Sequence, residues 1–379
     1  MKVLTVVGAR PQFVKAAPLS RALATDGISE ILVHTGQHYD HAMAGRFFEE
    51  LGIRAPDVNL GVGSDSHGRQ TARMLEGIEA VLVTEEPDWV VVYGDTNSTL
   101  AGALAAAKLH IPVAHIEAGL RSFNRRMPEE VNRVLTDHAA ELLFCPTATA
   151  VENLRREGFD ERRIHLVGDV MYDAAILFAA RAEHLSDIRE RLGLDDGGYV
   201  VATVHRAENT DSPARLSAIL CALARVAAEV PVVLPLHPRT RAAIERYGLA
   251  LPNSDRVRII EPVGYLDMLM LLKGARVVAT DSGGVQKEAF FAGAPCVTLR
   301  TETEWVELVD AGWNRLAPPD DEHAMVDRIL TATPPDTDAP ATIYGDGSAA
   351  RRIARILSEG PSRRDGRPDG GTRQGERRG

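Results

Sequence analysis

The strongest constraint on the fold is a regular alternation between short apolar runs and longer segments with helical periodicity. In the first half of the chain, the apolar runs predict strands at 3–7, 31–34, 89–93, 113–116 and 142–145. Segments between them, such as 15–24 and 99–109, predict helices. Strands that are apolar throughout are typical of a parallel sheet with helices on both faces.

The same alternation restarts near residue 199 and predicts a second α/β unit. Its predicted strands are 199–204, 232–236, 257–260, 277–280 and 296–299, and the two units join near 168–180. Two arrays of similar length predict two Rossmann-like domains with a ligand cleft between them. Residues 349–357 predict a terminal helix. Residues 360–379 have no apolar side chain except proline, so we assign 359–379 to a disordered tail.

Composition excludes several classes of protein. Lys and Arg number 43 and Asp and Glu 53, and the formal charge of −10 argues against a general nucleic-acid-binding protein. Three widely separated cysteines, Cys145, Cys221 and Cys296, exclude a disulfide framework and a CxxC metal site. No apolar run approaches the ~18 residues of a membrane span. We therefore expect a soluble cytoplasmic protein with no membrane partner.

Polar clusters follow six of the predicted strands, where ligands of open α/β sheets bind. The clusters lie at 8–15, 94–98, 117–121, 205–209, 237–239 and 281–284. Some of their members are cationic or basic, namely Arg10, Lys15, His205, Arg206 and His237, and others are carboxylates, namely Asp95, Glu117 and the nearby Glu129 and Glu130. Cations beside a helix start suit a phosphate-bearing ligand. Carboxylates suit proton transfer.

The segment 281–288 predicts a strand, a turn and a helix that together bind phosphate. Gly283 and Gly284 let a ligand approach the backbone, and the helix start presents free N–H groups. Glu288, about two turns into the helix, is placed to reach a ribose hydroxyl. In the alternative interpretation, Asp281 or Ser282 is simply a helix N-cap. No GxGxxG follows the first predicted strand, which argues against a tightly bound dinucleotide.

Several of these residues also have a purely structural interpretation. His34, His38 and His41 have the spacing of one helical face, but Gly36 interrupts a helix there, so we expect no metal site. Asp95 is a candidate helix N-cap. A carboxylate such as Glu117 is costly to bury at the end of an apolar strand unless it is paired or used, and its structural partner would be Arg121.

In this order, the motifs resemble those of the non-hydrolysing UDP-N-acetylglucosamine 2-epimerases. They are GARPQFVK at 8–15, GDT at 94–96, HIEAGLR at 115–121, PEEVNR at 128–133, HRAEN at 205–209 and DSGG at 281–284, and the resemblance runs from Met1 to about Leu357. It implies an α/β, glycosyltransferase-B-like fold in which two Rossmann-like domains flank a cleft. We therefore expect an N-terminal domain at 1–171, joined by a terminal helix at 343–358, and a C-terminal UDP-binding domain at 172–342.

The resemblance also implies an activity, the interconversion of UDP-GlcNAc and UDP-ManNAc by inversion at C2. The reaction eliminates UDP to a glycal and adds it back after reprotonation on the other face. By resemblance, Asp95, Glu117, Glu129 and His205 are catalytic. The residues expected to bind substrate and UDP are Arg10, Lys15, Arg121, Arg133, Arg206, His237, Ser282, Gly283, Gly284 and Glu288. The family uses neither metal nor nicotinamide and is usually dimeric, so we expect no cofactor and a homodimer.

Some positions depart from the common bacterial pattern. The first motif has Ala9 and Gln12 in place of Thr and Glu, and Trp305 and Val306 stand in a segment that is usually Thr-Glu-Arg-Pro-Glu. These variants resemble a branch that includes the 2-epimerases of UDP-2,3-diacetamido-glucuronic acid, in which Arg125 and Arg126 would meet a sugar carboxylate. A UDP-sugar glycosyltransferase and a non-catalytic nucleotide-sugar sensor remain as alternatives, although neither needs the three carboxylates.

Overall fold

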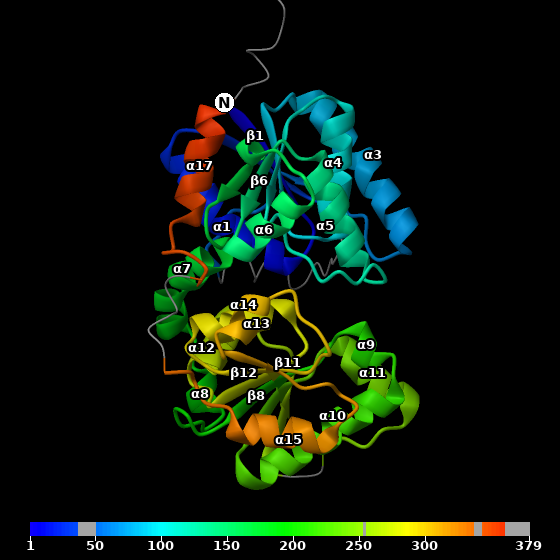
Figure 1. Ribbon diagram of the computed structural model, residues 1–379, viewed down its shortest axis with the longest axis vertical. Coiled ribbons are helices and arrows are strands. Elements are labelled where there is room, and N and C mark those ends of the chain that lie inside the picture. Colours follow the sequence, from blue (N-terminus) through cyan, green and yellow to red (C-terminus); the bar gives the residue numbers. More distant parts are fainter. Residues whose placement is uncertain (37–50, 253–254, 337–342, 361–379) are drawn as a thin grey trace, which may run out of the picture.

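The computed structural model describes residues 1–36, 51–252, 255–336 and 343–360. They form two stacked α/β units, each built on one parallel sheet with helices on both faces (Figure 1). The first sheet contains β1 (Lys2–Val7), β2 (Ser29–His34), β3 (Val58–Asn59), β4 (Trp89–Tyr93), β5 (Val113–Ile116), β6 (Leu142–Cys145) and β7 (Ile164–Leu166). The second contains β8 (Val200–Thr203), β9 (Val232–Pro235), β10 (Val257–Ile260), β11 (Val277–Thr280), β12 (Cys296–Thr298) and β13 (Asn314–Leu316).

All ten predicted strands are confirmed, with ends that shift by a residue or two. The prediction missed β3, β7 and β13, which each lie at the edge of a sheet and have only two or three residues. An edge strand is covered less completely than a central one, so its sequence need not be apolar throughout. The Ile-His-Leu of β7 and the Asn-Arg-Leu of β13 show this directly.

The two sheets have the same order over six strands, and the first sheet has a seventh strand, β7, at its edge. The first runs β3-β2-β1-β4-β5-β6-β7 and the second β10-β9-β8-β11-β12-β13. Each is therefore a doubly wound Rossmann-type sheet, in which the direction of winding reverses between β1 and β4 or between β8 and β11. The loops that follow these four strands carry the motifs at 8–15, 94–98, 205–209 and 281–284, so the polar clusters lie at both topological switch points.

The helices connect the strands and cover the sheets. Those of the first unit are α1 (Arg10–Thr25), α3 (His67–Glu85), α4 (Asn97–Lys108), α5 (Pro128–Ala139), α6 (Ala148–Arg156) and the 3-10 helix η1 (Glu161–Arg163). After the linking helix α7 (Val170–Leu185) come α8 (Ile188–Arg191), α9 (Ala207–Thr210), α10 (Pro213–Glu229), α11 (Pro238–Tyr247), α12 (Tyr265–Lys273), α13 (Gly283–Phe291), α14 (Val306–Asp310) and α15 (Glu322–Thr331). Proline near the start of α1, α5, α10 and α11 suits a position whose N–H has no helical partner.

The terminal helix α17 (Ala349–Glu359) returns to the first unit and lies beside α1 (Figure 1). The N–H groups of Ala349 and Ala350 donate to the Asp173 carboxylate of α7 at 3.2 and 2.8 Å. Ile353 and Leu357 are fully buried in the core that contains α1. α7 contacts α1 on one side and α12 and α13 on the other, so the boundary at 171/172 stays a prediction.

The C-terminal tail and the absence of a membrane span are both expected from the sequence. The predicted tail at 359–379 begins where α17 ends, and its residues 361–379 lie outside the described residues. In the described part of the chain, every helix is too short or too polar to span a bilayer.

Candidate active site

Gln12 joins the two strands that meet at the first switch point. Its amide oxygen accepts the N–H groups of Gly8 and Ala9 at 2.7 and 3.1 Å, and its amide nitrogen donates to the Tyr93 carbonyl at 2.8 Å. A carboxylate cannot make the last bond, because it has no proton to donate. A Cβ on Gly8 would lie 1.9 Å from Ser98 Oγ, so only glycine fits there. This turn brings Lys15 of α1 towards the ends of β4 and β5.

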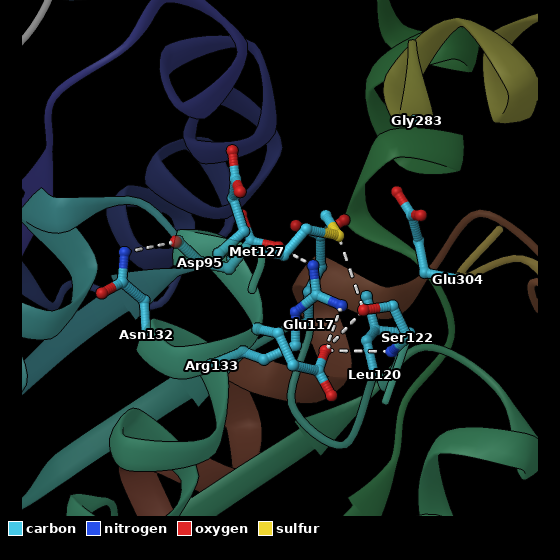
Figure 2. Close-up of polar contacts among 12 residues, drawn as sticks. Asp95, Glu117, Leu120, Ser122, Met127, Asn132, Arg133, Gly283 and Glu304 are labelled. Atoms are coloured by element: carbon cyan, nitrogen blue, oxygen red, sulfur yellow. Dashed lines mark hydrogen bonds and ion pairs between the residues drawn. The ribbon is translucent and has the colours of Figure 1, made fainter. Parts of the chain in front are cut away.

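Asp95 follows β4 and is held by α5. Arg133 Nη2 lies 2.5 Å from Asp95 Oδ2, and Asn132 Nδ2 donates to the Asp95 carbonyl at 3.0 Å (Figure 2). The side chain of Asp95 remains 29% exposed, whereas that of Arg133 is 3% exposed. The N-cap interpretation of Asp95 is wrong, since Thr96 caps α4 by accepting from Thr99 N. Asp95 therefore keeps a carboxylate oriented but accessible.

Glu117 is the most constrained carboxylate of the site. It lies at the end of β5, is 4% exposed and has a left-handed backbone with φ of 67°. For a residue other than glycine, this conformation costs on the order of 1–3 kcal/mol and persists only where surrounding contacts fix it. Such outliers cluster at functional sites. The backbone thus supports a functional role for this carboxylate.

A cation from each unit fixes the Glu117 carboxylate. Lys15 of α1 bonds Oε2, and Lys287 of α13 donates to Oε1 at 2.8 Å. Burial alone would raise the pKa of Glu117, but the two ammonium groups lower it to about 2. Arg121 is not the partner of Glu117. It pairs instead with Asp137 and Glu157, each at 2.7 Å.

The second unit orients His205 through its backbone. The buried Asp281 carboxylate at the end of β11 accepts the N–H groups of His205 and Arg206 at 3.0 Å and the Asn209 amide at 3.0 Å. These bonds fix the loop after β8. The rings of His205 and His237 lie 5.2 Å apart, and burial lowers the pKa of His205, which favours a neutral imidazole.

The segment that follows β11 has the predicted strand–turn–helix form. Ser282 is the N-cap of α13, and its hydroxyl accepts from Val285 N at 3.5 Å. Gly284 has open space where a Cβ would stand, whereas a Cβ on Gly283 would lie 2.3 Å from Glu304 Oε1. Glu288 is 8% exposed, and its burial raises its pKa to about 7. Gly284 is exposed, so an anion can approach the helix start at that residue.

Arg206 and Glu304 bring the two sets of residues together. Arg206 lies 3.8 Å from Glu129 of α5 and 3.7 Å from Glu304. Burial raises the pKa of Glu304, but Arg300, Arg206 and Arg133 lower it to about 2. Figure 2 shows Gly283 and Glu304 with the residues around Asp95 and Arg133. A cavity of about 130 Å³ lies at the junction of the units, lined by residues that include Leu120, Phe123, Thr147, Glu304 and Glu307.

Comparison with known proteins decides the family. A family model described as UDP-N-acetylglucosamine 2-epimerase matches residues 21–358. The chain belongs to the UDP-N-acetylglucosamine 2-epimerase family. This epimerase, an isomerase, is 53% identical to the UDP-2,3-diacetamido-2,3-dideoxy-D-glucuronate 2-epimerase of Pseudomonas aeruginosa, over 95% of this chain and 100% of that protein. It is 44% identical to the UDP-N-acetylglucosamine 2-epimerase of Methanocaldococcus jannaschii, over 95% and 100%.

A solved structure confirms the fold of the epimerase. The Methanocaldococcus jannaschii UDP-GlcNAc 2-epimerase in complex with UDP-GlcNAc and UDP superimposes with a TM-score of 0.88 at 43% identity, covering 95% of this chain and 100% of that chain. The predicted α/β, glycosyltransferase-B-like fold is therefore confirmed.

The epimerase brings most of its predicted site residues together. Asp95, Glu117, Lys15 and Arg133 gather in the first unit, and Arg206 and the start of α13 face them from the second. Arg121 lies in its own buried ion-pair cluster, so its expected part in substrate binding stays a prediction. The backbone of Arg10 begins α1, but its side chain lies outside the described part of the chain.

Sequence reasoning missed Lys287, Asp169 and Glu304. Lys287 and Asp169 are joined at 2.5 Å, although they are 118 positions apart. A single sequence has no local signal for such a contact. Among the described residues, no group of three His, Cys, Asp or Glu side chains is arranged to hold a metal ion, and His38 and His41 lie outside them.

Proposed function

We propose that this epimerase inverts C2 of a UDP-linked 2-acetamido sugar, interconverting UDP-GlcNAc and UDP-ManNAc. The observation that carries the proposal is Glu117, a buried carboxylate on a strained backbone, held by Lys15 from one unit and Lys287 from the other. The relative from Methanocaldococcus jannaschii has a structure with UDP-GlcNAc and UDP, which supports this substrate class.

The second unit provides the groups that suit UDP. The start of α13, at Ser282, Gly283 and Gly284, presents backbone N–H groups to the diphosphate, and Arg206 adds a cation. These donors stabilise the negative charge that develops on the leaving UDP. Glu288 is assigned to the ribose. The other residues proposed to contact phosphate or sugar are His205, His237, Arg10 and Lys15.

The first unit provides the groups for proton transfer. The C2 proton has no adjacent carbonyl to stabilise a carbanion, so its removal is coupled to breaking the C1–O bond. A base takes the proton, the electron pair forms the C1–C2 double bond and UDP leaves. Reprotonation on the opposite face and return of UDP complete the inversion. Asp95, Glu117 and Glu129 are the proposed acid and base, because they are the carboxylates of the first unit that the resemblance assigns to catalysis.

A second candidate substrate is UDP-2,3-diacetamido-2,3-dideoxy-D-glucuronate. The relative from Pseudomonas aeruginosa is named for that sugar and is 53% identical. Arg125 and Arg126 are exposed in the loop between β5 and α5, and Asn124 fixes this loop to Glu302 of the second unit at 2.9 Å. An arginine at this position suits a sugar carboxylate, which UDP-GlcNAc lacks.

We further propose a cytoplasmic homodimer that acts in polysaccharide biosynthesis. The buried free thiols of Cys145 and Cys296 fit a reducing compartment. Light scattering coupled to size-exclusion chromatography tests the dimer, and a monomer at micromolar concentration would contradict it.

Proton NMR of the enzyme in D2O tests the activity. Each UDP-sugar is incubated separately, and the C2 position and sugar configuration are followed. Deuterium at C2 together with a new manno-configured UDP-sugar is the expected result. The substrate that reacts faster shows which of the two sugars the enzyme prefers. UDP binding without exchange into either sugar would instead favour a transferase or a sensor.

A further inference from the structure

Lys287 is a buried cation that crosses from the second unit into the first. Its side chain is 1% exposed, and Nζ donates to Glu117 Oε1 at 2.8 Å and to Asp169 Oδ2 at 2.5 Å. The ring of Trp305 lies beneath the ammonium group, 4.1 Å from Nζ to the ring centroid. Two carboxylates of the first unit and one aromatic face of the second thus surround a single charge. Burial alone would lower the pKa of Lys287, but the two carboxylates raise it, so the group stays charged.

The position of Lys287 links this ion-pair cluster to the proposed nucleotide site. Lys287 stands on α13, whose first residues are the proposed diphosphate cradle, and the next residue is Glu288. Asp169, its second partner, is the N-cap of α7 and accepts from Met171 N at 2.7 Å. α7 is the helix that connects the two units. A shift of α13 relative to the first unit therefore moves the cation that holds Glu117.

Trp305 explains why a lysine fits at this place. The ring of Trp305 presents an aromatic face to the ammonium group of Lys287. Trp305 is 4% exposed, and its indole N–H donates to the Gly283 carbonyl at 2.9 Å. That bond fixes the ring against the start of α13. The ammonium group of Lys287, which belongs to α13, is thereby held next to Glu117.

We propose that Lys287 is a positioning residue for epimerisation, which sets the orientation and charge of Glu117 only when α13 and the first unit are docked together. Its contacts are with Glu117, Asp169 and Trp305, and it acts through Glu117. Lys15 supplies a permanent cation from the same unit as Glu117, while Lys287 supplies one that depends on the approach of the two units. This inference rests on the proposed function.

Substitution of Lys287 separates this role from simple packing. K287M keeps most of the length of the side chain and removes its charge, and K287Q keeps a polar group in case the methionine variant does not fold. The matched control is Lys273→Met, which removes an exposed lysine of α12 that pairs with Glu183. For each variant, kcat and KM for C2 exchange are measured as functions of pH, with UDP affinity by calorimetry and the unfolding temperature.

We expect K287M and K287Q to lower kcat by at least about 10-fold and to change the dissociation constant of UDP by less than about 3-fold. Loss of one of two cations raises the pKa of Glu117 from about 2, so the acid limb of the kcat profile moves to higher pH. The charged groups that bear on this titration are Lys15 on Glu117, Asp169 on Lys287, and Glu288 and Glu307 nearby. The Lys273 control has the wild-type profile.

A kcat within about 3-fold of wild type and an unmoved acid limb would overturn the inference. Equal loss of kcat and of UDP affinity would also overturn it, because a general disruption of α13 predicts that pattern. If the wild-type enzyme itself does not exchange the C2 proton, the proposed function fails first, and the two failures are therefore distinguishable.

Discussion

The two sheets of the molecule share their strand order over six strands. They differ in what the carboxylates at their carboxyl ends do. In the first unit, Asp95 and Glu117 project carboxylates that cations hold in place. In the second, the carboxylate of Asp281 is used entirely to bond backbone and amide N–H groups. The groups proposed to meet the diphosphate there are the start of α13 and Arg206, with His205 and His237 nearby.

The difference shows how one architecture is divided between two tasks. Each switch point offers loops that can carry any side chain, so the strand order by itself does not specify chemistry. In the proposed function, the first unit has the groups for moving a proton, and the second has the groups for holding a leaving diphosphate. Neither set suffices alone for elimination and re-addition.

The largest expected effect comes from removing one key group in each unit. Asp95→Asn and His205→Ala should each lower kcat by roughly 100- to 10,000-fold, because one removes a proposed proton-transfer group and the other a proposed group beside the leaving UDP. Deuterium incorporation at C2 measures the rate, and circular dichroism checks the fold. Glu76→Gln, on the exposed face of α3, is the matched control. A wild-type rate in either variant would contradict the role proposed for the residue that was replaced.

Glu288→Gln should alter the dependence of stability on pH. Burial raises the pKa of Glu288 from 4.5 to about 7, so the folded state favours the protonated form. The native protein therefore loses stability as pH rises from about 4.5 to 7, by up to about 3 kcal/mol. The variant, which cannot ionise, should be more stable than wild type at pH 8 and equal to it at pH 4. The measurement is the unfolding temperature of wild type and variant between pH 4 and pH 8. A constant difference between the two proteins across this range would contradict the prediction.

Adjacent glycines of α13 should differ in their tolerance of alanine. At Gly283 a Cβ would collide with Glu304, and overpacking of this kind costs about 1–3 kcal/mol. At Gly284 it would meet nothing within 4 Å. We expect Gly283→Ala to lower the free energy of unfolding and Gly284→Ala to leave it unchanged in urea titrations. Equal losses in both would show that the helix start, and not the Glu304 contact, sets the constraint.

The smallest expected effect is that of the C-terminal tail. A chain that ends at Gly360 keeps α17 and its contacts with α1 and α7. Residues 361–379 contain no apolar side chain other than proline. Truncation should leave kcat and KM for C2 exchange unchanged. A loss of more than about 3-fold would show that the two units are not the whole of the catalytic machinery.

Sequence alone predicted the parts of the molecule that have a local signal. Apolar runs such as those of β1 and β4 specify central strands, and the motifs after them fall at the switch points because parallel strands share one carboxyl edge. The contacts between the units have no such signal. Lys287 bonds Glu117, which is 170 positions away in the sequence. Arg121 pairs with Asp137 and not with Glu117, although Glu117 is closer in the sequence, because of how β5 and α5 pack.

A double-label experiment tests the central claim, that the first unit moves the C2 proton while the second holds UDP as a leaving group. UDP-GlcNAc labelled with ¹⁸O at the oxygen between C1 and the β-phosphate is incubated in D2O, and the diacetamido-glucuronate substrate is treated likewise. We expect deuterium at C2 together with migration of ¹⁸O to non-bridging phosphate positions, since the β-phosphate can rotate after the C1–O bond breaks and before UDP returns. Inversion at C2 with neither deuterium uptake nor ¹⁸O migration would contradict it, because C2 would then have inverted without exchange of its proton and without breaking of the C1–O bond.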